Sequence, residues 1–338
     1  MSAKLTALMT TYNCGRYINA AIDSVLAQTF TDFELLIIDD GSLDNTVSLI
    51  NAYEDPRITL INYSENQGVG ARLGQALHHI NTPYLVKTDA DDISTPHRFA
   101  EQLAYLQSSG ADIVKCYINY FSDSPDVARS PRFTYFKTIK ENQVNAVNTS
   151  QGIHQQLPRW LCFPHCSYMA KTALVKQVGY PASRMFEDYG LFLRLYNAGA
   201  VFDCINASLV NMRVSNSSTT ATASTDELDE GLEVIVAAKQ TGINALGMQG
   251  PLYIFGTGGL AQALQRVLAA RSIAIEGFIE REQGITSAKV SPVFCLQEIL
   301  NKEASAKILI AAQPVRDEIC TLLAANNLTE WQDYMVIN

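Results

Sequence analysis

Apolar and polar residues alternate in blocks along the first third of the chain. Short apolar runs at residues 5–9, 33–38, 58–62 and 84–86 are typical of buried strands, and each ends abruptly at polar residues. Between these runs, apolar residues recur every third or fourth position, as at residues 17–28, and this spacing predicts helices. Strands that alternate with helices of this length predict right-handed crossovers and a largely parallel sheet.

Polar residues follow each of the four predicted strands. They include Tyr12 after the first strand, Asp39 at the end of the second, Asn66 after the third and the acidic run 89–92 after the fourth. In parallel α/β sheets, ligands bind beyond the carboxyl ends of the strands. Four polar clusters at one edge of a sheet are more than helix capping requires, so this edge is the predicted binding site.

The fourth strand leads into three carboxylates within four residues, Asp89, Asp91 and Asp92. Such crowding is repulsive unless a cation offsets it, and Mg²⁺ or Mn²⁺ takes carboxylate oxygens together with those of a bound diphosphate. Residues 94–96 (Ser-Thr-Pro) follow and predict the start of a helix, with proline in its first turn. A loop that only caps this helix is the alternative interpretation of the acidic run.

Four short motifs follow the predicted strands: 10–13 (Thr-Thr-Tyr-Asn), 38–42 (Ile-Asp-Asp-Gly-Ser), 65–68 (Glu-Asn-Gln-Gly) and 89–92 (Asp-Ala-Asp-Asp). Two more lie further on: 163–167 (Phe-Pro-His-Cys-Ser) and 186–189 (Phe-Glu-Asp-Tyr). The first four resemble, in order and spacing, the donor-side motifs of family 2 glycosyltransferases, which have the GT-A fold, and the last two resemble the acceptor-side segments of that family. The resemblance extends over residues 5 to about 215.

The resemblance implies a donor-binding set made of Thr11, Tyr12, Asp39, Arg72, Asp89 and Asp91. Within it, Asp39 would contact the edge of the nucleotide base. Asp91 would ligate Mg²⁺ or Mn²⁺ beneath the diphosphate, and Asp89 would contact the sugar or the ribose. Arg72 lies near the place where the family carries a basic residue that contacts the nucleotide.

Glycosyl transfer also needs a base that removes the proton of the acceptor hydroxyl. The resemblance assigns this role to Asp188 and places Glu187 and His165 on the acceptor side. From the residues alone, a carboxylate at a predicted helix start is equally typical of helix capping. A histidine beside apolar neighbours, such as His165, is more often packed in the core than catalytic.

Two features depart from the family pattern. Ser215 stands where the family often carries a histidine, which leaves Asp91, phosphates and water as the expected metal ligands. Residues 156–160 spell the Gln-x-x-Arg-Trp signature of processive polysaccharide synthases. In those enzymes the signature follows the Glu-Asp segment, whereas here it precedes Asp188, so processive synthesis is not expected.

Composition and charge argue against some partners and locations of the protein. A net charge of −9 without a basic cluster argues against nucleic acid as a partner. The odd, unpatterned set of seven cysteines suits reduced thiols in a cytoplasm. No apolar run reaches the ~18 residues that span a bilayer, and no signal region opens the chain. We therefore expect a cytoplasmic protein without a transmembrane segment, able to make peripheral contact with the inner face of the membrane.

The C-terminal third has its own pattern. Residues 215–225 are small and polar and predict a flexible connection, followed by an amphipathic helix from about 227 to 240. A strand at 252–255, a turn at 256–259 (Gly-Thr-Gly-Gly), a helix and an acidic Glu280 match part of a dinucleotide fingerprint. With two further strands, this is about half of a Rossmann domain, either a cofactor site or a docking module.

The sequence thus predicts an α/β protein with three parts. Residues 1–225 form a GT-A domain with a mostly parallel sheet, 226–250 a connecting helix and linker, and 251–338 a small Rossmann-like domain. The expected activity is metal-dependent, inverting transfer of a sugar from a nucleoside diphosphate sugar, with uridine as the favoured nucleoside. The acceptor is expected to be a hydroxyl of a carbohydrate or lipid-linked molecule in cell-surface polysaccharide synthesis. A sugar-phosphate nucleotidyltransferase and a non-catalytic nucleotide-sugar sensor are the alternatives.

Overall fold

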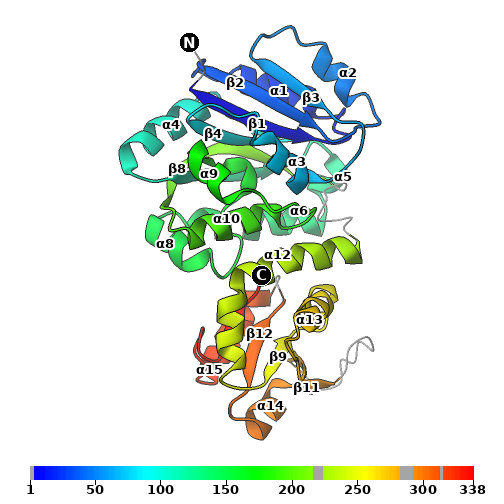
Figure 1. Ribbon diagram of the computed structural model, residues 1–338, viewed down its shortest axis with the longest axis vertical. Coiled ribbons are helices and arrows are strands. Elements are labelled where there is room, and N and C mark those ends of the chain that lie inside the picture. The colour runs from blue at the N-terminus through cyan, green and yellow to red at the C-terminus, as the bar shows by residue number, and fades with distance from the viewer. Residues whose placement is uncertain (1–3, 216–223, 282–291, 313–314) are drawn as a thin grey trace. The chain divides into compact units, whose positions relative to one another are not determined.

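The computed structural model describes residues 4–215, 224–281, 292–312 and 315–338 (Figure 1). Contacts divide the chain into two compact units, Met1–Thr222 and Ala223–Asn338. Each unit is built around its own sheet, and each is described here by itself. The predicted flexible connection falls largely on residues 216–223, which lie outside the described residues. Independent folding of the two segments stays a prediction.

The first unit contains an eight-stranded sheet with the order β3-β2-β1-β4-β7-β6-β8-β5. Its first four strands are parallel: β1 (Leu5–Thr11), β2 (Phe33–Asp39), β3 (Ile58–Asn62) and β4 (Tyr84–Asp89). These are the four strands that the apolar runs predict. β1, β2 and β4 are largely buried and rich in branched residues because helices cover both faces of the sheet, whereas β3, at the sheet edge, is only partly buried.

The other half of this sheet is mixed. It consists of β7 (Met169–Lys171), β6 (Ile113–Phe121), β8 (Phe202–Arg213) and β5 (Ile93–Ser94). β7 is antiparallel to both neighbours, β6 and β8 are parallel, and β5 is antiparallel to β8. The prediction of a helix start at residues 94–96 is wrong, because Ser94 pairs with β8 and helix α4 (Arg98–Ser109) begins after the proline.

Helices pack on both faces of this sheet. On one face, α1 (Ile18–Leu26), α2 (Thr46–Asn51) and α4 share a core with the odd-numbered residues of β1 and β2. On the other face lie α3 (Val69–Ala76), α9 (Thr172–Val178) and α10 (Glu187–Asn197) (Figure 1). The segment between β6 and β7 holds the remaining short helices: α5 (Pro125–Ala128), α6 (Pro131–Tyr135), η1 (Phe136–Lys140), α7 (Glu141–Ala146), α8 (Ser150–Gln156) and η2 (His165–Ser167).

The second unit is a five-stranded, wholly parallel sheet with the order β11-β10-β9-β12-β13. Its strands are β9 (Leu252–Phe255), β10 (Gly277–Glu280), β11 (Val293–Cys295), β12 (Lys307–Ile310) and β13 (Tyr334–Val336). Its helices are α12 (Thr225–Gly247), α13 (Gly259–Ala270), α14 (Leu296–Lys302) and α15 (Arg316–Ala325). The strand order confirms the prediction of a small Rossmann-like α/β domain. The sequence predicted four of its strands and missed the fifth, β13.

Helix α12 begins with a capping box in which Ser224 and Glu227 satisfy each other's backbone amides. Its apolar side chains, among them Leu232, Ile235 and Ile243, are buried, and it packs on α13 and β13. By contacts, the predicted connecting helix is therefore part of the second unit. Among the described residues, no helix is both long and apolar enough to cross a membrane.

Candidate active site

Strand register brings the predicted donor-side residues to one edge of the first sheet. Thr10 pairs with Asp89 across β1 and β4, Thr11 pairs with Asp39 across β1 and β2, and Asp39 pairs with Asn62 across β2 and β3. The strand order reverses between β1 and β4, which makes this the topological switch point where α/β sheets bind ligands. The edge predicted from the sequence is therefore assembled.

The loops after β1 and β2 are tied together by hydrogen bonds. Asn13, whose φ of 51° is left-handed, accepts a bond from the Leu43 amide (2.8 Å) and donates its own amide to Ser42 Oγ (2.9 Å). Asp39 is fully buried and accepts from the Ser42 amide (2.9 Å) and hydroxyl (2.5 Å). Thr11 is also buried, whereas Tyr12 is 43% exposed and presents its ring to solvent.

Arg72 lies under the loop that follows β3. It is 1% exposed, its Nε donates to Asp40 Oδ1 (2.6 Å), and its guanidinium lies 3.7 Å from the centre of the Tyr63 ring. It also donates to the Glu65 carbonyl and to Gln75 (2.7 Å). These contacts give Arg72 a role in holding the loops, and its direct contact with a nucleotide stays a prediction.

The three carboxylates of the acidic loop have different partners. Asp89 accepts a hydrogen bond and ion pair from Lys87, a fully buried residue of β4. Asp92 is buried and accepts from the Arg213 amide (2.7 Å). The Asp91 side chain accepts no hydrogen bond from another of the described residues, and only its backbone carbonyl is bound, by Arg213 Nε (2.7 Å).

Burial and mutual repulsion shift the pKa values of this loop. Burial, together with the negative charge of Asp89, raises the pKa of Asp91 to about 6. Burial and the charges of Asp91 and Asp89 raise the pKa of Asp92 well above its usual range. Burial acts in the same direction on Asp89, but Lys87 and His165 outweigh it, so its pKa lies below the usual value. Clustered carboxylates with raised pKa values are what a divalent cation would stabilise.

Asp89, Asp92 and Cys166 form an acidic group that offers oxygen and sulfur atoms within 4.8 Å of one another. The oxygens suit Mg²⁺ or Mn²⁺, which prefer hard ligands. The thiol does not, because burial and the charge of Asp92 raise the pKa of Cys166 well above its usual range and keep it protonated. The acidic loop therefore fits a hard divalent cation through carboxylates alone.

The carboxylates predicted for the acceptor side stand at the start of α10. Phe186, at a left-handed φ of 58°, turns the chain so that Glu187 and Asp188 occupy the first helical turn. Asp188 Oδ1 accepts a hydrogen bond from the amide of the next residue, Tyr189 (2.6 Å), and the N-cap residue, Phe186, makes no side-chain cap. Burial nevertheless raises the pKa of Asp188 to about 6, and burial with the charge of Asp188 raises that of Glu187 well above its usual range. Both carboxyls experience the charge of Asp89, which places the two acidic groups in one electrostatic environment.

His165 lies in η2, near Lys87 and Asp89. Its Nε2 is 2.9 Å from the Tyr180 hydroxyl, and its ring packs near Tyr168. Burial, reinforced by Lys87, lowers the pKa of His165 to about 3, so the ring is neutral at physiological pH. His165 is packed and satisfied as well as close to Asp89, which is compatible with both interpretations drawn from the sequence.

The site predicted from the sequence does not include three cationic side chains that lie near the acidic loop. Lys87 binds Asp89, Arg98 donates to the Lys87 carbonyl (2.8 Å), and Arg213 binds the Asp91 carbonyl. The Arg213 guanidinium lies between two rings, 4.5 Å from the centre of Tyr17 and 4.4 Å from that of Phe121. Lys87 is recognisable in the sequence as a charged residue within an apolar strand. Arg213 is not, because it reaches the loop through the pairing of β8.

The loop after β3 and the loop before α10 contact each other directly. Arg184, just before α10, donates to the side chain (2.6 Å) and the carbonyl (3.1 Å) of Asn66. Gly70 in α3 lies so close to this loop that a Cβ there would be 2.3 Å from the Ser183 carbonyl and 2.4 Å from that of Pro181. The loop that leads to Asp188 is thus fixed to the loop that follows β3.

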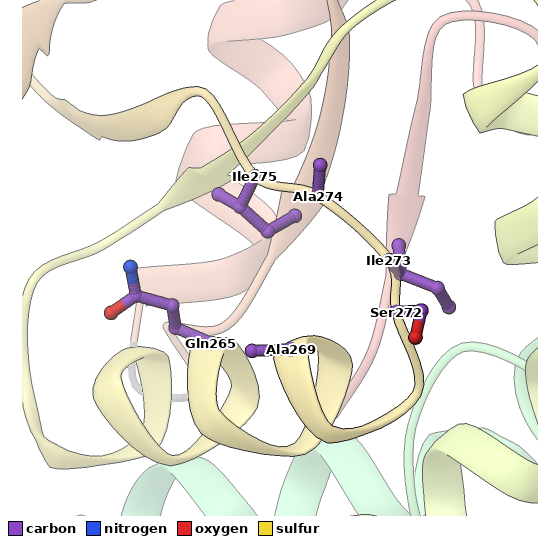
Figure 2. Close-up of a pocket in the computed structure, with 6 residues that line it drawn as sticks. All are labelled: Gln265, Ala269, Ser272, Ile273, Ala274 and Ile275. Carbon is purple, nitrogen blue, oxygen red and sulfur yellow. The ribbon is translucent and has the colours of Figure 1, made fainter.

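The second unit offers a different kind of edge. The turn 256–259 follows β9, and Thr257 Oγ1 donates to Glu280 at the end of β10. A Cβ on Gly258 or Gly259 would meet open space. A hollow of about 360 Å³ lies between α13 and residues 272–275, and Figure 2 shows the side chains that line it. It is lined by Gln265, Ala269, Ser272, Ile273, Ala274 and Ile275. These loop residues precede β10, so the hollow lies at the opposite edge of the sheet from the glycine turn.

Comparisons with known proteins agree with this architecture. Residues 6–176 match the family described as Glycosyl transferase family 2. WbnJ of Escherichia coli, an O-antigen biosynthesis glycosyltransferase, is 28% identical over 225 residues, which cover 65% of this chain and 83% of WbnJ. EpsE of Bacillus subtilis (strain 168) is 35% identical over 107 residues, 31% of this chain and only 38% of EpsE, so the chain spans well under half the length of that relative.

Two solved structures share the fold. TarS 1–349 of S. aureus, in complex with UDP-GlcNAc, has a TM-score of 0.54 at 17% identity and aligns with 71% of this chain and 67% of its own. The mannosyltransferase PcManGT of Pyrobaculum calidifontis, in complex with GDP-Man and Mn²⁺, has a TM-score of 0.51 at 18% identity and aligns with 81% and 76%. With the family match over half of the sequence, the chain belongs to glycosyltransferase family 2.

Proposed function

We propose that this enzyme transfers a sugar from a nucleoside diphosphate sugar to a hydroxyl group of a carbohydrate or lipid-linked acceptor, with inversion at the anomeric carbon. The observation that carries the proposal is the pair of acidic groups at one sheet edge. One group, at Asp91, has a carboxylate that accepts no hydrogen bond from another of the described residues, and the other, at Asp188, has a pKa of about 6. The first suits a diphosphate-bound cation, and the second suits a general base.

Each group has a chemical task in this reaction. Mg²⁺ or Mn²⁺ bound at Asp91 would stabilise negative charge on the departing diphosphate. Asp39 and Tyr12 hold the nucleoside at the ends of β2 and β1, and Asp89 accepts a hydrogen bond from the sugar or the ribose. Asp188 removes the proton of the acceptor hydroxyl, and its raised pKa makes it a stronger base than an ordinary aspartate. Glu187 and His165 line the acceptor side.

The nucleoside and the biological setting are also part of the proposal. TarS binds UDP-GlcNAc and PcManGT binds GDP-Man and Mn²⁺, which supports a nucleoside diphosphate sugar as donor and Mn²⁺ as a usable metal. Uridine is the nucleoside that we favour. The likeness to WbnJ supports a role in the synthesis of a cell-surface polysaccharide. A lipid-linked acceptor would bring the cytoplasmic enzyme to the inner face of the membrane.

Release of nucleoside diphosphate tests the proposal. Purified protein is incubated with UDP- and GDP-sugars in Mn²⁺, and diphosphate release is measured with and without excess chelator. Donor turnover is expected to require the metal, and Asp91→Asn should reduce it by about a hundredfold. Asp126→Asn is the matched control, because the Asp126 side chain is 91% exposed on α5 and forms a surface ion pair with Arg129. Full turnover in chelator, or an equal loss in both variants, contradicts the proposal.

A further inference from the structure

Lys87 is an unusual residue for its position. It lies in β4, it is fully buried, and its Nζ donates to the Asp89 carboxylate and to the Thr88 carbonyl (2.8 Å). Lysine is rarely fully buried unless its charge is paired, because desolvation of the ammonium is unfavourable. An apolar residue would suit a buried strand position better, so the buried charge of Lys87 calls for an explanation.

Two other buried lysines show what a purely structural lysine does here. Lys115 in β6 donates to the carbonyls of Val144 (2.7 Å) and Cys162 (3.0 Å). Lys239 in α12 donates to the carbonyls of Val336 (3.1 Å) and Ile337 (2.6 Å). Both fasten backbone segments through carbonyl oxygens. Lys87 pairs with a carboxylate, as the buried Lys307 does with Asp333 (2.9 Å), but the partner of Lys87 belongs to the acidic loop.

The ion pair changes what Asp89 offers to a cation. Its Oδ1 is occupied by the ammonium, and the pair has no net charge. A divalent cation placed on Asp89 would approach the ammonium as well and be repelled by it. Asp92 is less accessible, since its side chain is buried and Oδ1 accepts from the Arg213 amide. The Asp91 carboxylate feels the charges of Arg213 and Lys87, but it accepts no hydrogen bond from another of the described side chains, so its oxygens are open to a cation.

We propose that Lys87 is a positioning residue that withholds Asp89 from the metal and reserves its second oxygen for the donor, so that the cation is left to Asp91. The inference rests on the proposed function, because it concerns the same donor site. It explains how three neighbouring carboxylates can divide two tasks. It also explains why a buried lysine stands two residues before the acidic loop.

The first test measures Mn²⁺ binding to the protein without donor, by calorimetry or by electron paramagnetic resonance of free Mn²⁺. In Lys87→Met, Asp89 loses its partner and becomes an additional ligand, so Mn²⁺ should bind about threefold or more tightly. The KM for the donor should rise about tenfold, since Asp89 has turned to the metal. Lys115→Met is the matched control and should leave Mn²⁺ affinity unchanged, whatever its effect on melting temperature.

A second variant covers the case in which Lys87→Met does not fold. In Lys87→Met with Asp89→Asn, both charges of the pair are removed, so no buried charge is left unpaired. Because Asp91 still holds the cation, Mn²⁺ affinity should stay within about twofold of the wild type. A tenfold loss would show that Asp89 binds the metal in the native protein, and unchanged or weaker Mn²⁺ binding in Lys87→Met overturns the inference equally.

The binding titration separates this inference from the proposed function. If Mn²⁺ affinity shifts as expected but no nucleotide sugar is turned over, the role of Lys87 stands and the proposed reaction is wrong. If sugars are transferred but Mn²⁺ affinity does not respond to residue 87, the reaction stands and the role of Lys87 is wrong.

Discussion

The two sheets share a plan and differ in chemistry. The order β3-β2-β1-β4 of the first sheet has its counterpart in β11-β10-β9-β12 of the second, and both sets of strands are parallel. Both also place an acidic residue at the end of the second strand, Asp39 and Glu280. The two units differ after the fourth of these strands. There the chain of the first unit continues into the acidic loop, and that of the second continues into Ala311 and Ala312.

The comparison shows that topology provides a binding edge but not its chemistry. In the first sheet, burial and the charge of Asp89 in β4 raise the pKa values of Asp91 and of the two carboxyls of α10, a combination suited to a cation and a proton. In the second sheet, Glu280 accepts a hydrogen bond from Thr257, and the turn offers backbone amides. We therefore expect the catalytic chemistry to depend on the first edge alone.

The largest expected effect tests the base. Asp188→Asn keeps the size and the capping capacity of the side chain but cannot take a proton. The transfer rate should fall by about a hundredfold or more, while donor affinity is retained. Melting temperature at pH 7.5 should be equal or higher, because an ionised carboxyl that burial disfavours is removed. If Asp188 only caps α10, Asp188→Ala lowers stability by about 1 kcal/mol and turnover persists in both variants.

A smaller effect concerns pH. Asp188 must be ionised to act, so kcat/KM at saturating Mn²⁺ should fall about tenfold per pH unit below about pH 6. The effect of Asp188 on stability has the opposite sign. Because its pKa is raised in the folded state, its contribution to the free energy of unfolding decreases as pH rises from 3.8 to about 6 and is then constant. Asp188→Asn should flatten both profiles, and an unchanged acidic limb in that variant would assign the titration to another group.

The smallest effect concerns the second unit. A chain that ends at Thr222 should hydrolyse donor within about threefold of the full chain, because the acidic groups all lie before that residue. Thr222 is a better end point than a residue after α12. A chain that kept α12 without the rest of the second unit would expose Leu232 and Ile235, and each exposure would cost about 1.5–3 kcal/mol of stability. Glu280→Gln in the full chain should change turnover less than twofold. A hundredfold loss in either protein would make the second edge part of the catalytic unit.

The sequence predicts the first four strands and their polar ends well, because each apolar run is bounded by residues that cannot continue a strand. It predicts less of what long-range pairing decides. β5 reads as the start of a helix because its two residues are strand only when β8 lies beside them. β13 has three residues and is recognised as a strand only beside β12.

The candidate site follows the same rule. Asp89, Asp91 and Asp188 stand out as clustered carboxylates near predicted strand or helix ends. Arg213 does not, because it reaches Asp91 from a strand more than a hundred residues later. Lys87 was detectable as a charged residue within an apolar strand, but its partner depends on how β4 ends. Charge compensation is thus harder to predict than the charges that need it.

The close contact at Gly70 has a consequence for engineering new acceptor specificity. With carbonyls of residues 181 and 183 at less than 2.5 Å from any added Cβ, and Arg184 bound to Asn66, the two loops form one interlocking part. Exchanging the segment before α10 between relatives, as in a chimera, would separate Arg184 from the asparagine that receives it. A functional chimera should therefore carry residues 65–70 and 181–188 from the same parent.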